Sequence, residues 1–312
     1  MNQGEIVYEN FYISDEEGKT PSIPLYTPDI ALSLDEESDV RPYETYSVEM
    51  RASGFEVMEI QNVQVFAEES SYLPVHPIPT RRQVFEGRDI SNIPDHHLLT
   101  NYGGNNQGQT PHNNGRILSQ IVIPTFITVH LGRPQSNAEN VTVPFLYYLK
   151  NVASSEIYPT WPYEALKANI WAQASLALNR VYTEWYPSQG YDFDITNSTQ
   201  YDQAYVPERD IFENISQIVD EIFNNYVRRQ GSVEPYFTQY CNGTTSTCAG
   251  LSQWGTVELA NQGYLPYEIL RYYYGDDIDI VRNAPVQNVE ESYPGIAQRR
   301  GMRSNNIRIL QG

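Results

Sequence analysis

Residues 162–185, PYEALKANIWAQASLALNRVYTEW, decide the fold of this 312-residue chain. Apolar side chains recur in this stretch every three or four residues, which is the spacing of one face of an α-helix. They are Leu166, Ile170, Ala174, Leu178, Val181 and Trp185. Pro162 and Glu164 stand where a first helical turn favours proline and acidic residues. We therefore predict one long helix here.

Similar patterns predict further helices on both sides of this stretch. A short stripe runs from Phe145 to Val152 and ends at Pro159, which cannot continue a helix. Residues 208–230 repeat the helical spacing, end in two arginines and stop at Gly231, so they give a second clear prediction. Two shorter helices are expected over residues 253–261 and 266–274, each followed by glycine.

The first 80 residues predict strands instead of helices. Apolar side chains alternate over residues 46–50, 58–60 and 63–65, and prolines and Gly54 punctuate the segment. We expect a small β-sandwich over residues 1–80, and a linker with lead-in strands over residues 81–140. The whole chain is therefore predicted to be α+β, with a mainly helical second half.

Composition excludes some functions. Twenty Lys and Arg against 39 Asp and Glu give a net charge of −19, which repels nucleic-acid phosphates and anionic lipid headgroups. No stretch approaches the length of a membrane span, and the first residues show no export signal. The 25 tyrosines suit stacking on sugar rings, although tyrosine is also an ordinary strand and core residue.

Two segments in the second half resemble a known family. The first reads VPFLYYLKNVASSE over residues 143–156 and continues through Trp161-Pro162 to EALKA at residues 164–168. The second reads GLSQWG over residues 250–255 and continues to YEILRYYYG at residues 267–275. Together they resemble the SpoIID/LytB family of sporulation and cell-wall proteins, and Asp194 with Gln203-x-Tyr205 is similar to further family elements. The resemblance predicts a SpoIID-like domain over residues 141–285.

Weaker resemblances mark the two ends of the chain. Residues 18–21, 41–46, 54–56 and 63–66 are similar to parts of carboxypeptidase-regulatory-like sandwiches. Residues 293–312, with Gly301, Ile307 and Leu310-Gln311, resemble the start of a peptidoglycan-binding module. This ending also suggests that the sequence is a piece of a longer protein.

The family resemblance implies a glycan-cleaving acid, and two glutamates stand in the matching motifs. A lytic transglycosylase needs one carboxylic acid that is protonated near neutral pH, because the sugar's own hydroxyl replaces water. Glu164 lies in a predicted first helical turn, which favours the ionised carboxylate. Glu156 is expected at a helix C-terminus among Ile157, Tyr158 and Trp161, where both the dipole and desolvation raise a carboxyl pKa. The physical argument favours Glu156, and the resemblance supports either.

Six residues are candidates for binding the sugar. An amide could hydrogen-bond an N-acetyl group while an aromatic ring stacks on the pyranose, and the alternative for Trp254 is a place in the core. The candidates are Gln203, Tyr205, Tyr240, Ser252, Gln253 and Trp254. Two departures put activity in question: Ala174-Ser175-Leu176 replaces the family's Arg-Thr-Tyr, and Thr247-Cys248-Ala249-Gly250 replaces its Gly-His-Gly.

Cys241 and Cys248 are the two cysteines of the chain and are separated by seven positions. A disulfide is favoured outside a reducing compartment; a zinc site, known in some family members, and two free thiols are the alternatives. Asp95, His96, His97 and His112 could suggest a second metal site, but a solvated loop is favoured there. We expect neither metal nor cofactor.

The sequence thus predicts a peptidoglycan lytic transglycosylase of sporulation or cell-wall remodelling, located outside the cytoplasm in the cell wall or spore envelope. Its expected partners are glycan strands, together with cell-wall hydrolases or sporulation proteins; nucleic acid is excluded. The main alternative is a non-catalytic peptidoglycan-binding or scaffold protein with the same fold. A phage or secretion-apparatus component is a more remote one.

Overall fold

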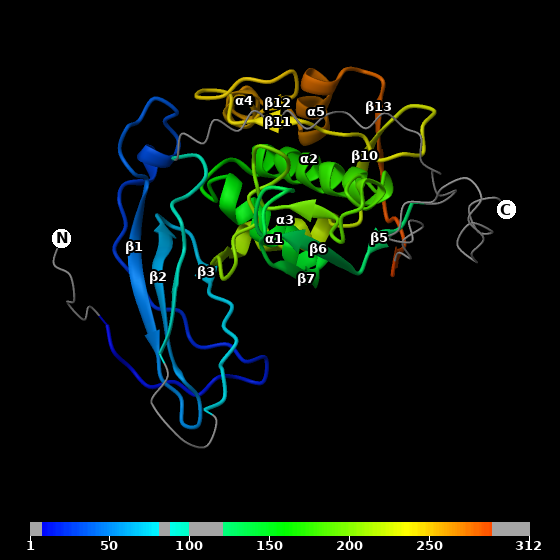
Figure 1. Cartoon of the computed structure of the whole chain (residues 1–312). Coiled ribbons are helices and arrows are strands. Elements are labelled where there is room, and N and C mark those ends of the chain that lie inside the picture. Colours follow the sequence, from blue (N-terminus) through cyan, green and yellow to red (C-terminus); the bar gives the residue numbers. More distant parts are fainter. Residues whose placement is uncertain (1–7, 81–87, 100–120, 289–312) are drawn as a thin grey trace, which may run out of the picture.

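The computed structural model describes residues 8–80, 88–99 and 121–288 (Figure 1). Five α-helices and several small sheets make up this part of the chain, so the predicted α+β class is confirmed. The predicted module at residues 293–312 and two parts of the predicted linker, 81–87 and 100–120 with His112, lie outside the described residues. Within those residues, no helix has the length and apolarity needed to cross a membrane.

Helix α2 (Tyr163–Tyr182) is the centre of the molecule. Every residue from Ala168 to Tyr182 is buried, because other elements pack around the whole circumference of the helix. Its neighbours are α1 (Phe145–Glu156), α3 (Glu213–Ile222), α4 (Gln253–Asn261), α5 (Pro266–Tyr274), β8 (Ile195–Thr196) and β10 (Tyr226–Arg229). A helix that is buried on all sides must carry partners for its polar side chains, and α2 uses them to hold its neighbours.

The predicted helices α1, α2, α4 and α5 are confirmed, whereas the helix predicted over residues 208–230 is wrong in extent. Helix α3 ends at Ile222, and Tyr226–Arg229 forms strand β10, which pairs antiparallel with β13 (Ile278–Val281). Tyr226 matches the helical spacing by coincidence. Tyr226 and its neighbour Val227 are both buried in the strand. The Val227 N–H donates to Ser175 Oγ of α2 at 2.8 Å, which fixes the strand against that helix.

Short strands complete the second half. Strands β6 (Phe126–His130), β7 (Asn140–Pro144) and β8 form one sheet in the order β7-β6-β8. The other pairs each join two strands. They are β11 (Tyr240–Cys241) with β12 (Leu251–Ser252), β5 (Ile123–Pro124) with β14 (Val286–Gln287), and β3 (Ser71–Tyr72) with β9 (Ile211–Phe212). Two 3₁₀ helices span Ile30–Ser33 and Pro187–Gln189.

The N-terminal strands form a long sheet beside the helical part (Figure 1). Strands β1 (Tyr43–Met50), β2 (Val57–Phe66) and β4 (Arg88–Asn92) form it in the order β1-β2-β4. Strand β3 lies outside this sheet, because it pairs antiparallel with β9. The small β-sandwich over residues 1–80 stays a prediction. Between Tyr46 and Val48 the register shifts, so that Ile60 and Val63 both enter the same small core.

An aromatic cluster joins the N-terminal sheet to the helices. Phe66 of β2 lies with its ring centroid 5.1 Å from Tyr43, 5.3 Å from Tyr158 and 5.2 Å from Phe212. His96 is fully buried among the same rings, so the solvated loop predicted for this segment is wrong at His96. Burial pushes the pKa of His96 well below its ordinary value, which keeps the imidazole neutral.

Candidate functional site

Glu156 is the last residue of α1, and its side chain is 1 % exposed. Its carboxylate accepts three hydrogen bonds: from Tyr240 Oη at 2.5 Å, from Gln173 Nε2 at 2.9 Å and from the Ala204 N–H at 2.7 Å. Pro159 prevents helix α1 from continuing beyond Glu156, and the apolar neighbours Ile157, Tyr158 and Trp161 are buried. The structure therefore places one carboxyl group in a dry, polar-lined enclosure.

The environment of Glu156 brings its titration close to neutral pH. Burial raises the pKa of the carboxyl to about 7, while the hydrogen bonds from Tyr240, Ala204 and Gln173 act in the opposite direction because they favour the charged form. Desolvation is the larger effect. A carboxyl with this pKa is populated in both protonation states near pH 7, as a group that must give and then take a proton requires.

Two further predicted residues belong to the same network. Gln203 donates from Nε2 to Tyr240 Oη at 2.9 Å and to the Gln173 carbonyl at 3.1 Å, and its Oε1 accepts from Tyr148 Oη at 2.9 Å. Both amide hydrogens of Gln203 are thereby used inside the protein. In this conformation Gln203 orients the Tyr240 hydroxyl toward Glu156.

The Ser252-Gln253-Trp254 element lies at the start of α4. Gln253 Nε2 donates to the Glu156 main-chain carbonyl at 3.4 Å, so this amide contacts the predicted acid through its backbone. Ser252 caps the helix by accepting from the Gly255 N–H at 3.0 Å. Trp254 is 7 % exposed and packs 4.8 Å from Trp161, as the core alternative for this residue expects.

Tyr205 and Glu164 lie apart from this network. Tyr205 stacks on Tyr148 with ring centroids 5.8 Å apart and lines a neighbouring cavity. Glu164 stands partly exposed in the first turn of α2, where no hydrogen bond or ion pair joins it to the other candidates. The structure thus separates the two glutamates, and only Glu156 has the enclosure that raises a carboxyl pKa.

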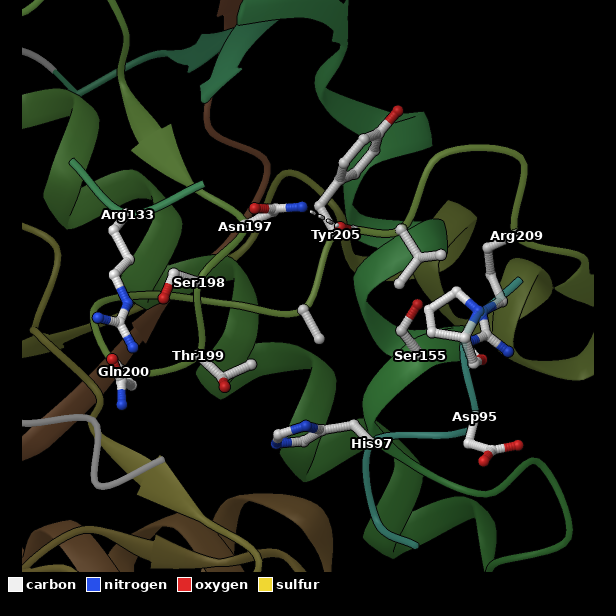
Figure 2. Close-up of a pocket in the computed structure, with 13 residues that line it drawn as sticks. Asp95, His97, Arg133, Ser155, Asn197, Ser198, Thr199, Gln200, Tyr205 and Arg209 are labelled. Carbon is white, nitrogen blue, oxygen red and sulfur yellow. Dashed lines mark hydrogen bonds between the residues drawn. The ribbon is translucent and has the colours of Figure 1, made fainter. Parts of the chain in front are cut away.

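A cavity of about 380 Å³ lies beside residues that adjoin Glu156 in the chain or bind it, and Figure 2 shows the residues that line this cavity. Ser155, the residue before Glu156, and Ala204, whose N–H bonds the carboxylate, both line it. Most of the other lining residues are of polar types. These other residues are Pro94, Asp95, His97, Arg133, Asn197, Ser198, Thr199, Gln200, Tyr205, Val206 and Arg209. The candidate acid therefore lies directly behind the cavity wall.

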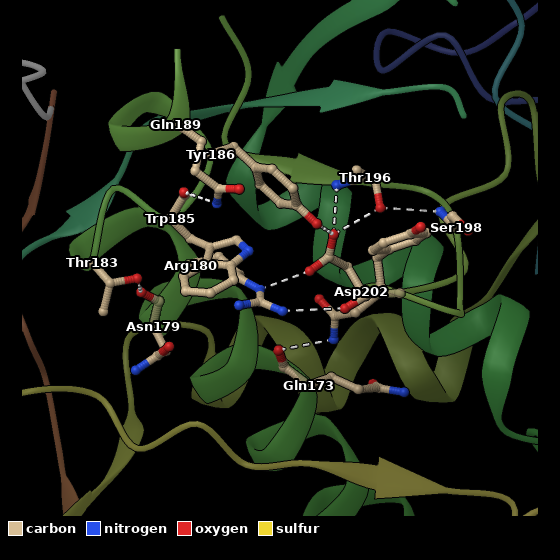
Figure 3. A network of polar contacts seen from close by, with 12 residues as sticks. Gln173, Asn179, Arg180, Thr183, Trp185, Tyr186, Gln189, Thr196, Ser198 and Asp202 are labelled. Carbon is tan, nitrogen blue, oxygen red and sulfur yellow. Dashed lines mark hydrogen bonds and ion pairs between the residues drawn. The ribbon is translucent and has the colours of Figure 1, made fainter. Parts of the chain in front are cut away.

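A buried ion pair holds the loop that carries this wall (Figure 3). Arg180 of α2 donates from Nε to Asp202 at 2.7 Å, and both side chains are almost completely buried. The other carboxylate oxygen of Asp202 accepts from Tyr186 Oη at 2.5 Å, the Thr196 N–H at 3.0 Å and Thr196 Oγ1 at 2.7 Å. These contacts fix the loop against α2 at Asp202, which lies one position before Gln203 and two before Ala204.

Sequence reasoning missed Gln173 and the Ala204 N–H as partners of Glu156. Gln173 follows its helical neighbours Ala165 and Asn169 at four-residue intervals and is itself 1 % exposed. The available sequence signal was a line of small and amide side chains in an otherwise apolar helix. This line indicated a buried polar face, because exposed helical faces usually carry charged residues. No sequence signal identifies a backbone N–H as a partner.

The cysteine prediction is confirmed: Cys241 and Cys248 form a disulfide that closes the loop after Tyr240. Zinc ligation by these two sulfurs is thereby excluded in this structure. Within residues 8–80, 88–99 and 121–288, no three His, Cys, Asp or Glu side chains form a group able to hold a metal ion.

Part of this chain is similar to known proteins. Residues 135–227 match the family model SpoIID, stage II sporulation protein. An uncharacterized protein of Brachyspira hyodysenteriae (strain ATCC 49526 / WA1) is 31% identical over 101 residues, which is 32% of this chain and 26% of that protein. The chain thus covers about a quarter of the relative's length, and no solved structure matches significantly. The SpoIID match over residues 135–227 points to a role connected with sporulation or the cell wall.

Proposed function

We propose that this protein cleaves peptidoglycan glycan strands at the cell envelope by lytic transglycosylation, with Glu156 as the acid and base. The single observation that supports this most is the burial of Glu156, which raises its pKa to about 7 without any ion pair. Enclosure beside polar donors is what a proton-transferring carboxyl needs, and the SpoIID match, which points to a sporulation or cell-wall role, supports the choice of a cell-wall substrate.

The proposed reaction uses one carboxyl group twice. Protonated Glu156 gives its proton to the bridging oxygen as the glycosidic bond breaks. The carboxylate then takes the proton of the sugar's own primary hydroxyl as that oxygen bonds to the anomeric carbon, which forms an anhydro ring and restores the acid. Tyr240 and Gln173 stabilise the intervening carboxylate, since both donate to it.

Substrate access requires a movement of the cavity wall. The Ala204 N–H occupies one oxygen of Glu156, and Ser155 and Ala204 separate the carboxyl from the cavity. A bound strand therefore has to displace the segment around Ala204, so that the bridging oxygen can approach the carboxyl.

Product analysis tests this proposal. Purified protein is incubated with peptide-free glycan strands, and the products are separated and identified by mass spectrometry. We expect anhydro-sugar ends from the wild type, a loss of at least about 100-fold in Glu156→Gln, and a change below about threefold in Glu164→Gln. Absence of anhydro products from the wild type, or equal activity of Glu156→Gln, contradicts the proposal.

The second candidate function is non-catalytic binding of the wall. It is favoured by a different observation: Ser155 and Ala204 form a wall between the Glu156 carboxyl and the cavity. Sedimentation with insoluble peptidoglycan, at equal affinity for wild type and Glu156→Gln and without any soluble product, is the outcome expected for this function.

A further inference from the structure

Two arginines of the cavity lack the carboxylate partners that the other basic residues have. The chain carries 39 acidic against 20 basic residues, so carboxylates are abundant. Within the described ranges, every lysine and arginine makes an ion pair except three. The three exceptions are Arg133, Arg209 and Arg282. Arg282 lies over the Trp171 ring, whereas Arg133 and Arg209 both line the cavity.

Of the two arginines, Arg209 has the greater need of hydrogen-bond partners, because its side chain is fully buried. Its Nη2 donates to the Pro94 carbonyl at 3.1 Å, but Nε and Nη1 have no hydrogen-bond partner. A buried guanidinium with unpaired N–H groups costs free energy unless a ligand or water completes its hydrogen bonds. The carboxylates of Asp210 and Asp95 interact electrostatically with Arg209, although neither lies within ion-pair distance of it.

Among the residues that line the cavity, cationic side chains outnumber carboxylates; Asp210, which acts on Arg209, lies outside the lining. Arg133 and Arg209 lie on opposite sides of the cavity, with His97 between them (Figure 2). Burial lowers the pKa of His97 to about 4, so this imidazole is neutral near pH 7. Asp95 is the one carboxylate among the lining residues, which leaves two cations against one anion. In a chain of net charge −19, such a site selects an anionic group.

We infer that this cavity binds the carboxylate of an acidic sugar, with Arg133 and Arg209 as its charged contacts. Arginine suits this role because its planar fork matches the two oxygens of a carboxylate. Ser198, Thr199 and Gln200 add hydroxyl and amide groups suited to sugar hydroxyls, and a volume of about 380 Å³ is within the range of small-molecule sites. The choice of a sugar rests on the proposed function; the choice of a carboxylate rests on the two arginines.

Binding of small probes tests the inference without requiring turnover. The full chain is titrated, with protein-observed NMR shifts as the readout, against N-acetylmuramic acid, its methyl ester, N-acetylglucosamine and the dipeptide alanyl-glutamate. We expect the acid to bind about tenfold more tightly than its ester or N-acetylglucosamine, and added salt to weaken only binding of the acids. Equal binding of acid and ester, or no binding of any probe, overturns the inference. Binding of the dipeptide as tight as that of the sugar acid overturns the assignment to a sugar.

Matched variants locate the site. Arg133→Gln removes an exposed cation and leaves the core untouched, so we expect it to reduce the preference for the acid at least fivefold. Arg282→Gln removes the other unpaired arginine, away from the cavity, and should leave that preference unchanged. Equal effects of the two variants contradict the site. Arg209→Lys, checked for folding by circular dichroism, should weaken the acid further.

Failure of this inference and failure of the proposed function are distinguishable. Glu156→Gln should keep the preference for the acid over its ester, because Glu156 does not line the cavity. If the wild type shows arginine-dependent binding without any cleavage, the carboxylate site stands and the cleavage proposal falls. If cleavage occurs while acid and ester bind equally, the reverse holds.

Discussion

Glu156 combines near-complete burial with three hydrogen-bond donors. Isolation from water favours the neutral acid, whereas Tyr240, Gln173 and Ala204 stabilise the carboxylate. The balance of these opposed effects gives a pKa of about 7. An ion pair in place of the neutral donors would have held the pKa low, and an apolar enclosure without donors would have raised it further.

The raised pKa makes stability depend on pH. Because the folded-state pKa of Glu156 lies above the ordinary value of 4.5, its contribution is fully present below pH 4.5 and is lost as pH rises through about 7. Relative to Glu156→Gln, which cannot ionise, the wild type should lose about 3 kcal/mol of unfolding free energy between pH 4.5 and 8. Urea denaturation of both proteins across this range measures the difference. A difference that stays constant with pH contradicts the assigned pKa.

Residue patterns predicted the direction of this pKa shift but not its partners. Ile157, Tyr158 and Trp161 next to Glu156 indicated desolvation, and all three are buried. Tyr240 lies 84 positions away in the sequence, so its hydroxyl could be nominated only as one of many tyrosines. Long-range contacts of this kind depend on where β11, which carries Tyr240, lies relative to the end of α1, and periodicity does not determine this.

Among the elements, α2 organises the site through its polar side chains. Gln173 contacts Glu156, Ser175 contacts β10, and Arg180 binds Asp202 in the loop that carries Ala204. These residues recur along a helix that is otherwise apolar, so each one has to find a specific partner in the surrounding elements. Helix α2 thereby fixes the positions of the neighbouring elements and also buries apolar surface.

Asp202→Asn tests the role of the buried ion pair. Removing one charge leaves Arg180 buried and uncompensated, so we expect a loss of about 3 kcal/mol in unfolding free energy. Asp220→Asn is the matched control, because Asp220 pairs with Lys150 at the surface with 52% of its side chain exposed, and it should cost less than about 1 kcal/mol. Similar losses in chemical denaturation for the two variants would refute a structural role for this pair.

The disulfide stabilises the element that presents Tyr240. Cys241 follows Tyr240 directly, and the crosslink closes a loop with a sequence separation of 7. Replacing both cysteines by serine should lower the unfolding free energy by about 2 to 3 kcal/mol, as expected for so short a loop. Thermal denaturation with and without reductant measures this effect. Reductant should lower the midpoint of the wild type alone, and an equal response of the double variant would contradict the prediction.

Sequence patterns predicted element type better than element extent. The stripes of α1, α2, α4 and α5 were sufficient because caps or breakers such as Pro159 and Gly263 mark their ends. In the segment after Ile222 no proline or glycine interrupts the spacing before Gly231, so the helical pattern continued into strand β10. The pairing with β13, more than 50 residues later, decides this segment.

In the whole molecule, the N-terminal sheet enters the main hydrophobic core of the helices through Tyr43 and Phe66, while Ile60 and Val63 form a separate small core. Tyr43 and Phe66 of the sheet belong to the same cluster as the helical residues, and Trp161 Nε1 donates to the Ser33 carbonyl at 3.1 Å. Such a shared core favours unfolding as one cooperative unit. The predicted modular arrangement of a sandwich followed by a separate domain did not include this contact, because the aromatic residues involved lie in four distant segments.

Phe66→Ala tests this cooperativity. Phe66 is 1 % exposed, and its removal should cost about 3 to 5 kcal/mol. The four tryptophans, Trp161, Trp171, Trp185 and Trp254, all lie in the second half, so their fluorescence reports on the helical part. The fluorescence transition should shift by the full amount. Phe126→Ala, at 53% exposure, should shift it by less than about 1 kcal/mol, and an unshifted transition in Phe66→Ala would show that the two parts unfold independently.

The pH dependence of the cleavage rate tests the central claim most directly. Initial rates on peptide-free glycan strands are measured at saturating substrate between pH 4.5 and 9. Because the bond-breaking step needs protonated Glu156, the rate should fall about tenfold per pH unit above a midpoint near 7. A rate that declines already above pH 4.5, or one that stays constant up to pH 9, would contradict a buried Glu156 as the acid.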